Sequence, residues 1–245
     1  TCAFPISFKS SAELKASARE KMFGHYGTAI GAVLIVMCIV GLATGISSIL
    51  VDMTTLSGTI LYYAITFFIT LLAGVFASGT TYLFLKIICG RPASAGDIFQ
   101  GFRLYPDKAI LIQAWVTLLT YVSQIPFMIL NYKMAHSVES DALKLMLPYA
   151  LSLILAGVVS VILSLLYDQA LYLLHDFPQY SARELLAKSR QIMKGHKGRL
   201  FYLYVSFLPL FLVSALSCGI AMLWLLPYMK ATQTEFFLDL IQNKK

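Results

Sequence analysis

Charged residues are scarce in this chain. Asp, Glu, Lys and Arg make up 13% of its 245 residues, whereas 58% are hydrophobic. A typical soluble domain carries about 25% charged residues and under half apolar ones. A soluble fold of this length cannot hide so much apolar surface, because much of any folded surface meets water. The composition therefore excludes an ordinary soluble protein and predicts an integral membrane protein.

Cysteine is also scarce, and the signatures of soluble catalytic sites are missing. The four cysteines are scattered, with no Cys-x-x-Cys pair, which excludes a zinc ribbon or a disulfide framework. The sequence has no Gly-x-x-x-x-Gly-Lys-Ser/Thr, His-Glu-x-x-His or Gly-x-Ser-x-Gly motif. We therefore expect no metal and no cofactor, and enzyme activity is not predicted. The net charge of +7 does not indicate a nucleic-acid partner, because membrane topology explains it.

Long apolar runs are what the sequence has instead. A helix that spans the hydrocarbon layer needs about 20 apolar residues. These runs are continuous rather than alternating, which favours helices over the strands of a membrane barrel. Four runs are plain, at residues 28–50, 60–88, 109–130 and 147–174.

The final apolar stretch, residues 200–228, is longer than one crossing needs. It contains SALSCGI at 214–220, which predicts a tight hairpin. We expect a fifth helix at 200–216 and a sixth from about residue 220 to residue 240. The alternative is one long tilted helix that leaves the C-terminus outside the cell.

Charge asymmetry favours the six-helix arrangement. With six crossings, all but two of the 19 Lys and Arg residues fall on one side, and the exceptions are Lys133 and Lys144. Positively charged loops stay on the cytoplasmic side. We therefore predict an all-α, polytopic membrane protein with six transmembrane helices and both termini in the cytoplasm. Residues 9–245 form a single integral membrane domain, and residues 1–8 form an atypical N-terminal extension.

Two stretches are nearly alike, ELKASAREKMFGHYG at 13–27 and ELLAKSRQIMKGHKG at 184–198. A looser third element, SAGDIFQGF, lies at 94–102. Each of these three elements precedes a pair of apolar runs, and each lies on the side of the membrane that we assign to the cytoplasm. We therefore predict three repeats of a short cytoplasmic amphipathic helix followed by a transmembrane hairpin. The repeat units cover about residues 9–88, 92–174 and 180–241.

The repeated helix has an apolar face and basic surroundings. In the later copy Leu185, Ile192 and Met193 share one face. We expect that face to lie in the headgroup layer, with basic side chains toward anionic inner-leaflet lipids, although topology alone also places positive charge there. A glycine ends each helix, and the histidine after it caps carbonyls or contacts a lipid phosphate. The candidate lipid contacts are Arg19, His25, Lys188, Arg190, Lys194, His196 and Lys197.

Polar residues within the apolar runs form a second set of candidates, because a charge at the bilayer centre costs about 2.5–3.5 kcal/mol. Asp168 lies near the end of the fourth run, and an ion pair with Lys230 is geometrically possible. Either such a pair locks the helices together, or Asp168 binds a substrate or a proton. The candidate cavity residues are Tyr167, Asp168, Gln169, Tyr228, Lys230 and Glu235.

Proline and glycine add local predictions. Pro126 and Pro209 are expected to break their helices and free carbonyls that line a cavity, and Pro227 is expected to kink the sixth helix. Small residues indicate close contacts between helices, namely Gly74, Ala77, Ser78 and Gly79 in the second run and Gly157 and Ser160 in the fourth.

Several segments resemble a known family. SAELKASAREKMFGHYGTAIGA, KSRQIMKGHKGRLFYLYVSFLPLFL and CGIAMLWLLPYMKATQTEFFLDL are similar to domain-of-unknown-function family 975, multi-pass membrane proteins found largely in Gram-positive bacteria. The resemblance covers about residues 10–240. It implies a six-helix domain in the bacterial cytoplasmic membrane, distantly similar to the membrane domain of some glycerophosphodiester phosphodiesterases. It brings no known catalytic residues.

Three functions stay open at this point. A permease-like or export-related protein with a polar cavity fits the repeats and Asp168. A non-transporting scaffold or regulator that binds anionic lipid, a partner membrane protein or a second copy of the chain fits the basic helices. Membrane-embedded catalysis near Asp168 and His175 has the weakest basis, because no nucleophile–base pair is recognisable.

Overall fold

A computed structural model describes residues 8–137 and 139–243, and every regular element in those ranges is a helix. Apart from Phe8, the predicted N-terminal extension lies outside the described residues. The elements are α1 (Ser11–Met22), α2 (Tyr26–Leu50), α3 (Leu56–Ile88), the 3-10 helix η1 (Ala95–Phe102), α4 (Pro106–Ala135), α5 (Glu139–Tyr167), α6 (Ala170–Asp176), α7 (Ala182–Ile192), α8 (Lys197–Val205), α9 (Leu208–Leu216) and α10 (Met222–Gln242).

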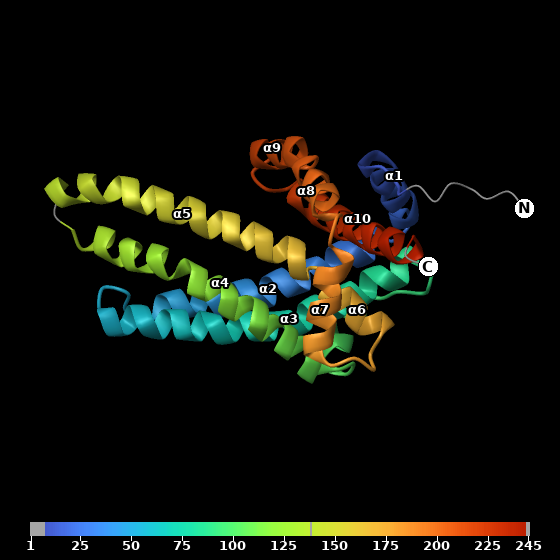
Figure 1. The fold of residues 1–245 in the computed structure, drawn as a ribbon, viewed down its shortest axis with the longest axis horizontal. Coiled ribbons are helices and arrows are strands. Elements are labelled where there is room, and N and C mark those ends of the chain that lie inside the picture. The colour runs from blue at the N-terminus through green and yellow to red at the C-terminus, as the bar shows by residue number, and fades with distance from the viewer. Residues whose placement is uncertain (1–7, 138, 244–245) are drawn as a thin grey trace, which may run out of the picture.

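Four long helices, α2 to α5, lie side by side and form an elongated body (Figure 1). The short elements α1, η1, α6 and α7 gather at one end of this body, which we call the collar end. The hairpin of α8, α9 and α10 also belongs to the collar end, and α10 finishes there. Within the described residues, the opposite end carries the connection from α2 to α3 and the ends of α4 and α5 that face each other.

The first three apolar runs each form one helix with nearly the predicted bounds, whereas the fourth is divided between α5 and α6 and the fifth between α8 and α9. Among the described residues, five helical stretches are long and apolar enough to cross a membrane. They are α2, α3, α4, the stretch Lys144–Asp176 of α5 and α6, and the stretch Lys197–Leu216 of α8 and α9. The predicted hairpin in the last run is confirmed, because α9 ends at Leu216 and α10 begins at Met222. Cys218 and Gly219 turn the chain there with φ values of 50° and 86°.

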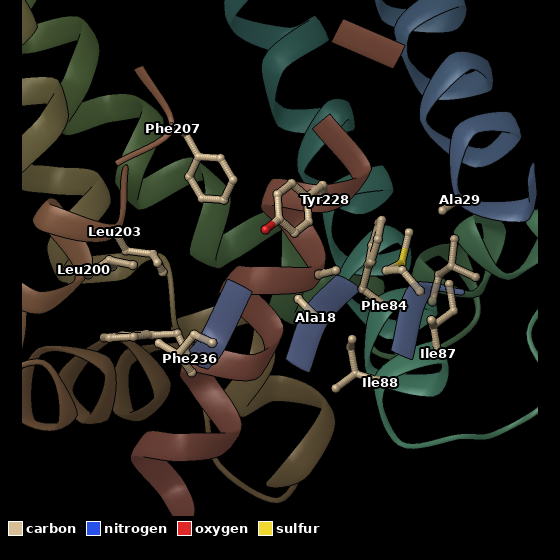
Figure 2. Packing of buried hydrophobic residues seen from close by; sticks show 14 of the residues in the cluster. Ala18, Ala29, Phe84, Ile87, Ile88, Leu200, Leu203, Phe207, Tyr228 and Phe236 are labelled. Carbon is tan, nitrogen blue, oxygen red and sulfur yellow. The ribbon is translucent and has the colours of Figure 1, made fainter. Parts of the chain in front are cut away.

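α10 differs from the other long helices because its middle is polar and buried. Its 21 residues are not among the stretches apolar enough to cross a membrane, so a sixth crossing is not confirmed. Every side chain from Ala231 to Phe237 is buried. α10 packs against α1, α2 and α3, and Phe236 contributes to a core with Ala18 and Phe84 (Figure 2). It is therefore the central support of the collar end.

The two similar stretches have the same local structure. α1 and α7 each begin with a capping box, with Ser10 and Ser181 as N-caps. Both helices end at a glycine in the left-handed region, with φ of 82° at Gly24 and 87° at Gly195. η1 also begins with a capping box, at Ser94. The similar sequences therefore specify the same kind of start, a capping box, for α1, η1 and α7. They specify the same kind of stop, a left-handed glycine, for α1 and α7.

The apolar face of α7 packs against protein, not lipid. Leu185 and Met193 are fully buried in the core, as are Leu14 and Met22 at the matching positions of α1. The expectation that this face lies in the headgroup layer is therefore wrong. Periodicity identifies an apolar face, but whether protein or lipid covers it depends on the distant elements that dock there.

The prolines disturb the helices less than predicted. α4 continues through Pro126, so the expected break there is wrong. Pro209 does lie at a break, in the first turn of α9 just after the end of α8. Pro227 lies inside the continuous helix α10, and its kink stays a prediction. Neighbouring helices compensate a lost helical hydrogen bond, which is why prolines are tolerated in apolar helices.

The predicted close contacts are confirmed at Gly74 and Gly79, whereas the one at Gly157 is wrong, because a Cβ atom there would meet nothing within 4 Å. η1 lies directly on α3, where a Cβ atom on Gly79 would overlap the carbonyl oxygen of Ile98. The contact is reciprocal, because a Cβ atom on Gly101 of η1 would overlap the carbonyl oxygen of Val75. Gly74 is similarly close to Gln113 of α4. Only glycine allows the backbones of η1 and α3 to approach so closely.

A histidine joins the two connections at the end opposite the collar. His136 follows α4, and its Nδ1 and Nε2 atoms lie 2.8 Å and 2.7 Å from the carbonyl oxygens of Tyr132 and Thr54. Carbonyl oxygens only accept hydrogen bonds, so both ring nitrogens must carry protons for both bonds to form. The pKa of His136 is raised above its usual value, mainly by the hydrogen bond to the Tyr132 carbonyl and secondly by the bond to the Thr54 carbonyl.

The bridge formed by His136 is expected to weaken with rising pH. Because the folded-state pKa is raised, its stabilising contribution is complete below about pH 6.5 and is lost as pH rises through the folded-state pKa. The melting temperatures of wild type and His136→Gln, measured in detergent, should differ more at about pH 6 than at about pH 9. A difference that does not change with pH would contradict this assignment.

Candidate functional site: an apolar groove with an arginine rim

Asp168 lies where α5 gives way to α6, inside one of the apolar stretches. Its carboxylate accepts a hydrogen bond from the hydroxyl of Tyr204 and another, at 3.3 Å, from the amide of Gln233. The side chain of Lys230 is exposed, and among the described residues it does not pair with Asp168. The predicted Asp168–Lys230 pair is therefore replaced by a cluster of Asp168, Tyr204 and Gln233.

The other predicted cavity residues belong to separate contacts. Glu235 is 2% exposed and pairs with Lys21 at 2.6 Å and with Lys9 at 3.6 Å. The Tyr228 hydroxyl donates to the carbonyl of Lys15 at 3.3 Å. These bonds attach α1 and the segment before it to α10. Tyr167 and Gln169 are buried, Tyr167 in the hydrophobic core. The six residues therefore do not converge on one site.

An apolar groove of about 730 Å³ lies between α3, α4 and α7. α4 contributes most of its wall, and Phe67 of α3 lines it as well. Several wall side chains are about half exposed, such as Trp115 at 47%. α7 closes the collar end of the groove with two arginines. The lining residues are Phe67, Leu111, Ala114, Trp115, Leu118, Ala182, Arg183, Leu186 and Arg190.

The helical repeat of α7 places both arginines at the groove. Arg183 and Arg190 are seven residues apart, which is about two helical turns, so they share one side of the helix. Leu186 lies between them on that side and lines the groove. The capping box of Ser181 and Glu184 starts the helix just before this point. The rim therefore carries two positive charges directly above apolar walls.

Neither rim arginine has a carboxylate partner in the described part of the chain. The nearby Glu184 is engaged in the capping box, where hydrogen bonds from the backbone N–H and the hydroxyl of Ser181 lower its pKa. Some other cations of the collar end are neutralised internally, as Arg199 is by Asp239 at 2.8 Å and Lys21 is by Glu235 at 2.6 Å. Arg183 and Arg190 thus remain available to an anion from outside the protein.

The remaining predicted lipid contacts lie on the collar end but outside this groove. Lys188 stands 3.7 Å above the ring of Tyr180, and Lys194 and Lys197 are exposed. His25 and His196 begin α2 and α8, but neither side chain caps its helix. The predicted contact of these imidazoles with carbonyls of the preceding helix or with a lipid phosphate stays a prediction.

Sequence reasoning found Arg190 and missed Arg183. The spacing of seven residues to Arg190 was the signal that could have found it. Arg183 stands in the first turn of α7, where basic residues are unfavourable next to the positive end of the helix dipole. Its position is therefore better explained by the groove than by the helix.

These observations define a class: a helical, multi-pass membrane protein with an anion-accessible apolar groove at one end of its bundle. The chain belongs to the family described as protein of unknown function (DUF975), whose model matches residues 8–244. No curated protein and no solved structure matches it. The similarity to the membrane domain of glycerophosphodiester phosphodiesterases stays a prediction.

Proposed function

We propose that this protein binds anionic phospholipids of the bacterial cytoplasmic membrane and acts there as a non-transporting scaffold or regulator. The pair of uncompensated arginines above an apolar groove carries the proposal. An anionic phospholipid has matching chemistry, a phosphate for the guanidinium groups and an acyl chain for the walls at Trp115 and Leu118. The wall residue Trp115 is 47% exposed, so a lipid acyl chain could contact it from the bilayer.

The proposal includes an orientation. The collar end faces the cytoplasm, because the positive-inside rule assigns Lys- and Arg-rich short loops to that side. The three repeat units then each start at the inner leaflet, and a sixth crossing by α10 stays a prediction. The groove rim lies at the level of the inner-leaflet headgroups, where anionic lipids are concentrated. A partner membrane protein or a second copy of the chain would bind alongside these lipids.

Lipid-dependent stability tests the proposal. Purified protein in detergent is titrated with phosphatidylglycerol or with phosphatidylcholine, which has the same acyl chains and no net charge. A ligand at 100 times its Kd stabilises the folded state by about 2.7 kcal/mol, which raises the melting temperature by roughly 5–10 °C. We expect this shift with phosphatidylglycerol only. Equal shifts with both lipids would reject selective binding of anionic lipid.

A second candidate function, transport, is favoured by one observation. Gln169 is fully buried, and both polar atoms of its side chain lack a hydrogen-bond partner among the described residues. The Oε1 atom of Gln233, next to Asp168, is also unpartnered there. Buried polar groups of this kind commonly bind water or an ion. A permease-like protein would use them to bind a polar substrate or a proton inside the membrane.

Transport predicts a specific role for Asp168. In proteoliposomes that report proton or solute flux, wild type would show flux and Asp168→Asn would lose it while still folding. If the cluster is structural, neither protein shows flux, and Asp168→Asn changes only the melting temperature. The flux of wild type therefore separates the two candidate functions.

A further inference from the structure

A second apolar groove lies at the collar end, on the other side of α10. It has a volume of about 320 Å³ and is bounded by α1, α2, α9 and α10. Trp224 on its wall is 53% exposed. One arginine, Arg19 of α1, stands at its rim. The lining residues are Arg19, Tyr26, Leu210, Val213, Ala221, Trp224, Leu225 and Tyr228.

Arg19 and Arg190 occupy the same place in the two similar stretches. Each arginine lies three residues before a fully buried methionine, Met22 or Met193. Both helices then stop at a left-handed glycine two residues later. Because the matching apolar side chains of α1 and α7 are buried in both helices, the two arginines emerge at equivalent positions of each helix. Each of them stands at the rim of an apolar groove.

The surroundings of Arg19 leave it available to an anion. Its Nη2 atom donates to the hydroxyl of Tyr228 at 3.4 Å, and its guanidinium lies 5.8 Å from the centre of the Tyr228 ring. No carboxylate among the side chains that the structure describes pairs with it. The neighbouring Lys21, by contrast, is neutralised by Glu235. Tyr228 thus orients the guanidinium, and most of its five N–H donors stay free.

We propose that this second groove is a separate binding site for an anionic phospholipid, with its phosphate on Arg19 and an acyl chain along Trp224 and Val213. The headgroup chemistry rests on the proposed function, but the residues are different ones. This site should be weaker than the groove of α3, α4 and α7, because it has one arginine instead of two and less than half the volume. The protein therefore holds two anionic lipids, one on each side of α10.

Counting bound lipids by native mass spectrometry tests this inference. Wild type titrated with phosphatidylglycerol should bind two lipids in distinguishable steps. Arg19→Gln should weaken the second step about fivefold or more, since a basic residue near an anionic headgroup contributes about 1 kcal/mol. The first step, at Arg183 and Arg190, should be unchanged and shows that the variant is folded. Lys194→Gln, which removes an exposed cation outside both grooves, is the matched control.

The possible outcomes separate the two proposals. If Arg19→Gln binds two lipids as wild type does, while Arg183→Gln/Arg190→Gln loses the tighter step, the second site is wrong and the proposed function stands. If all these variants bind like the Lys194→Gln control, both proposals fail. Tyr228→Phe provides a milder check, because it removes only the hydroxyl that orients Arg19. It should weaken the second step less than Arg19→Gln does.

Discussion

Replacing Gly79 with alanine is expected to lower the melting temperature of the detergent-solubilised protein by roughly 6–12 °C, from a destabilisation of about 3 kcal/mol. The added methyl group would overlap the carbonyl oxygen of Ile98, which belongs to the backbone of η1. A backbone cannot rotate away as a side chain can, so η1 must shift from α3. That shift also disturbs the core of the collar end, where Ile98 is fully buried.

The matched control is Gly157→Ala in α5. Gly157 has open space around the position of a Cβ atom, so alanine fits there, and in a helix it is favoured over glycine by roughly 0.5–1 kcal/mol. Its melting temperature should equal or exceed that of wild type. Similar losses in both variants would show that the chain tolerates no added methyl group in its apolar helices, and the specific contact of η1 with α3 would be refuted.

The double variant Arg183→Gln/Arg190→Gln is expected to weaken phosphatidylglycerol binding to the groove of α3, α4 and α7 about 30-fold. Each arginine near an anionic headgroup contributes about 1 kcal/mol, so two contribute about 2 kcal/mol. Both guanidinium groups lack an internal carboxylate partner in the described residues, so their removal leaves no buried charge unpaired. The variant should therefore fold normally and differ from wild type in lipid affinity.

Lys194→Gln/Lys197→Gln controls for the change in net charge. These two lysines are exposed on the same basic segment but do not line the groove. Titrations of phosphatidylglycerol followed by native mass spectrometry should give the control a Kd close to that of wild type. If both double variants lost affinity equally, the binding would be general electrostatic attraction to a positive surface, and the groove would have no special role.

The elements of the fold that depend on local chemistry were predictable from the sequence. Continuous apolar runs gave the helices, and the small residues of SALSCGI placed the turn between α9 and α10. The Ser-x-x-Glu motif specifies where α1 and α7 start, and the glycine that follows each helix specifies where it stops. These signals act over a few residues, so they do not need the rest of the structure.

The elements that depend on distant contacts were not predictable. Glu235 is buried because Lys21 and Lys9, more than 200 residues earlier in the chain, neutralise it. Asp168 takes Tyr204 and Gln233 as partners because α8 and α10 cross the end of α5, an arrangement that no local pattern encodes. The groove likewise exists only because α7 docks across α4, which brings Arg183 above Trp115.

A photoreactive acyl chain on phosphatidylglycerol tests the central claim most directly. After illumination in nanodiscs, peptide mass spectrometry locates the modified residues. We predict adducts concentrated on the α4 wall at Leu111, Trp115 and Leu118, and their loss in Arg183→Gln/Arg190→Gln. Adducts spread evenly over the apolar surface, including the exposed Leu151 and Ile154 of α5, would contradict a lipid site in the groove.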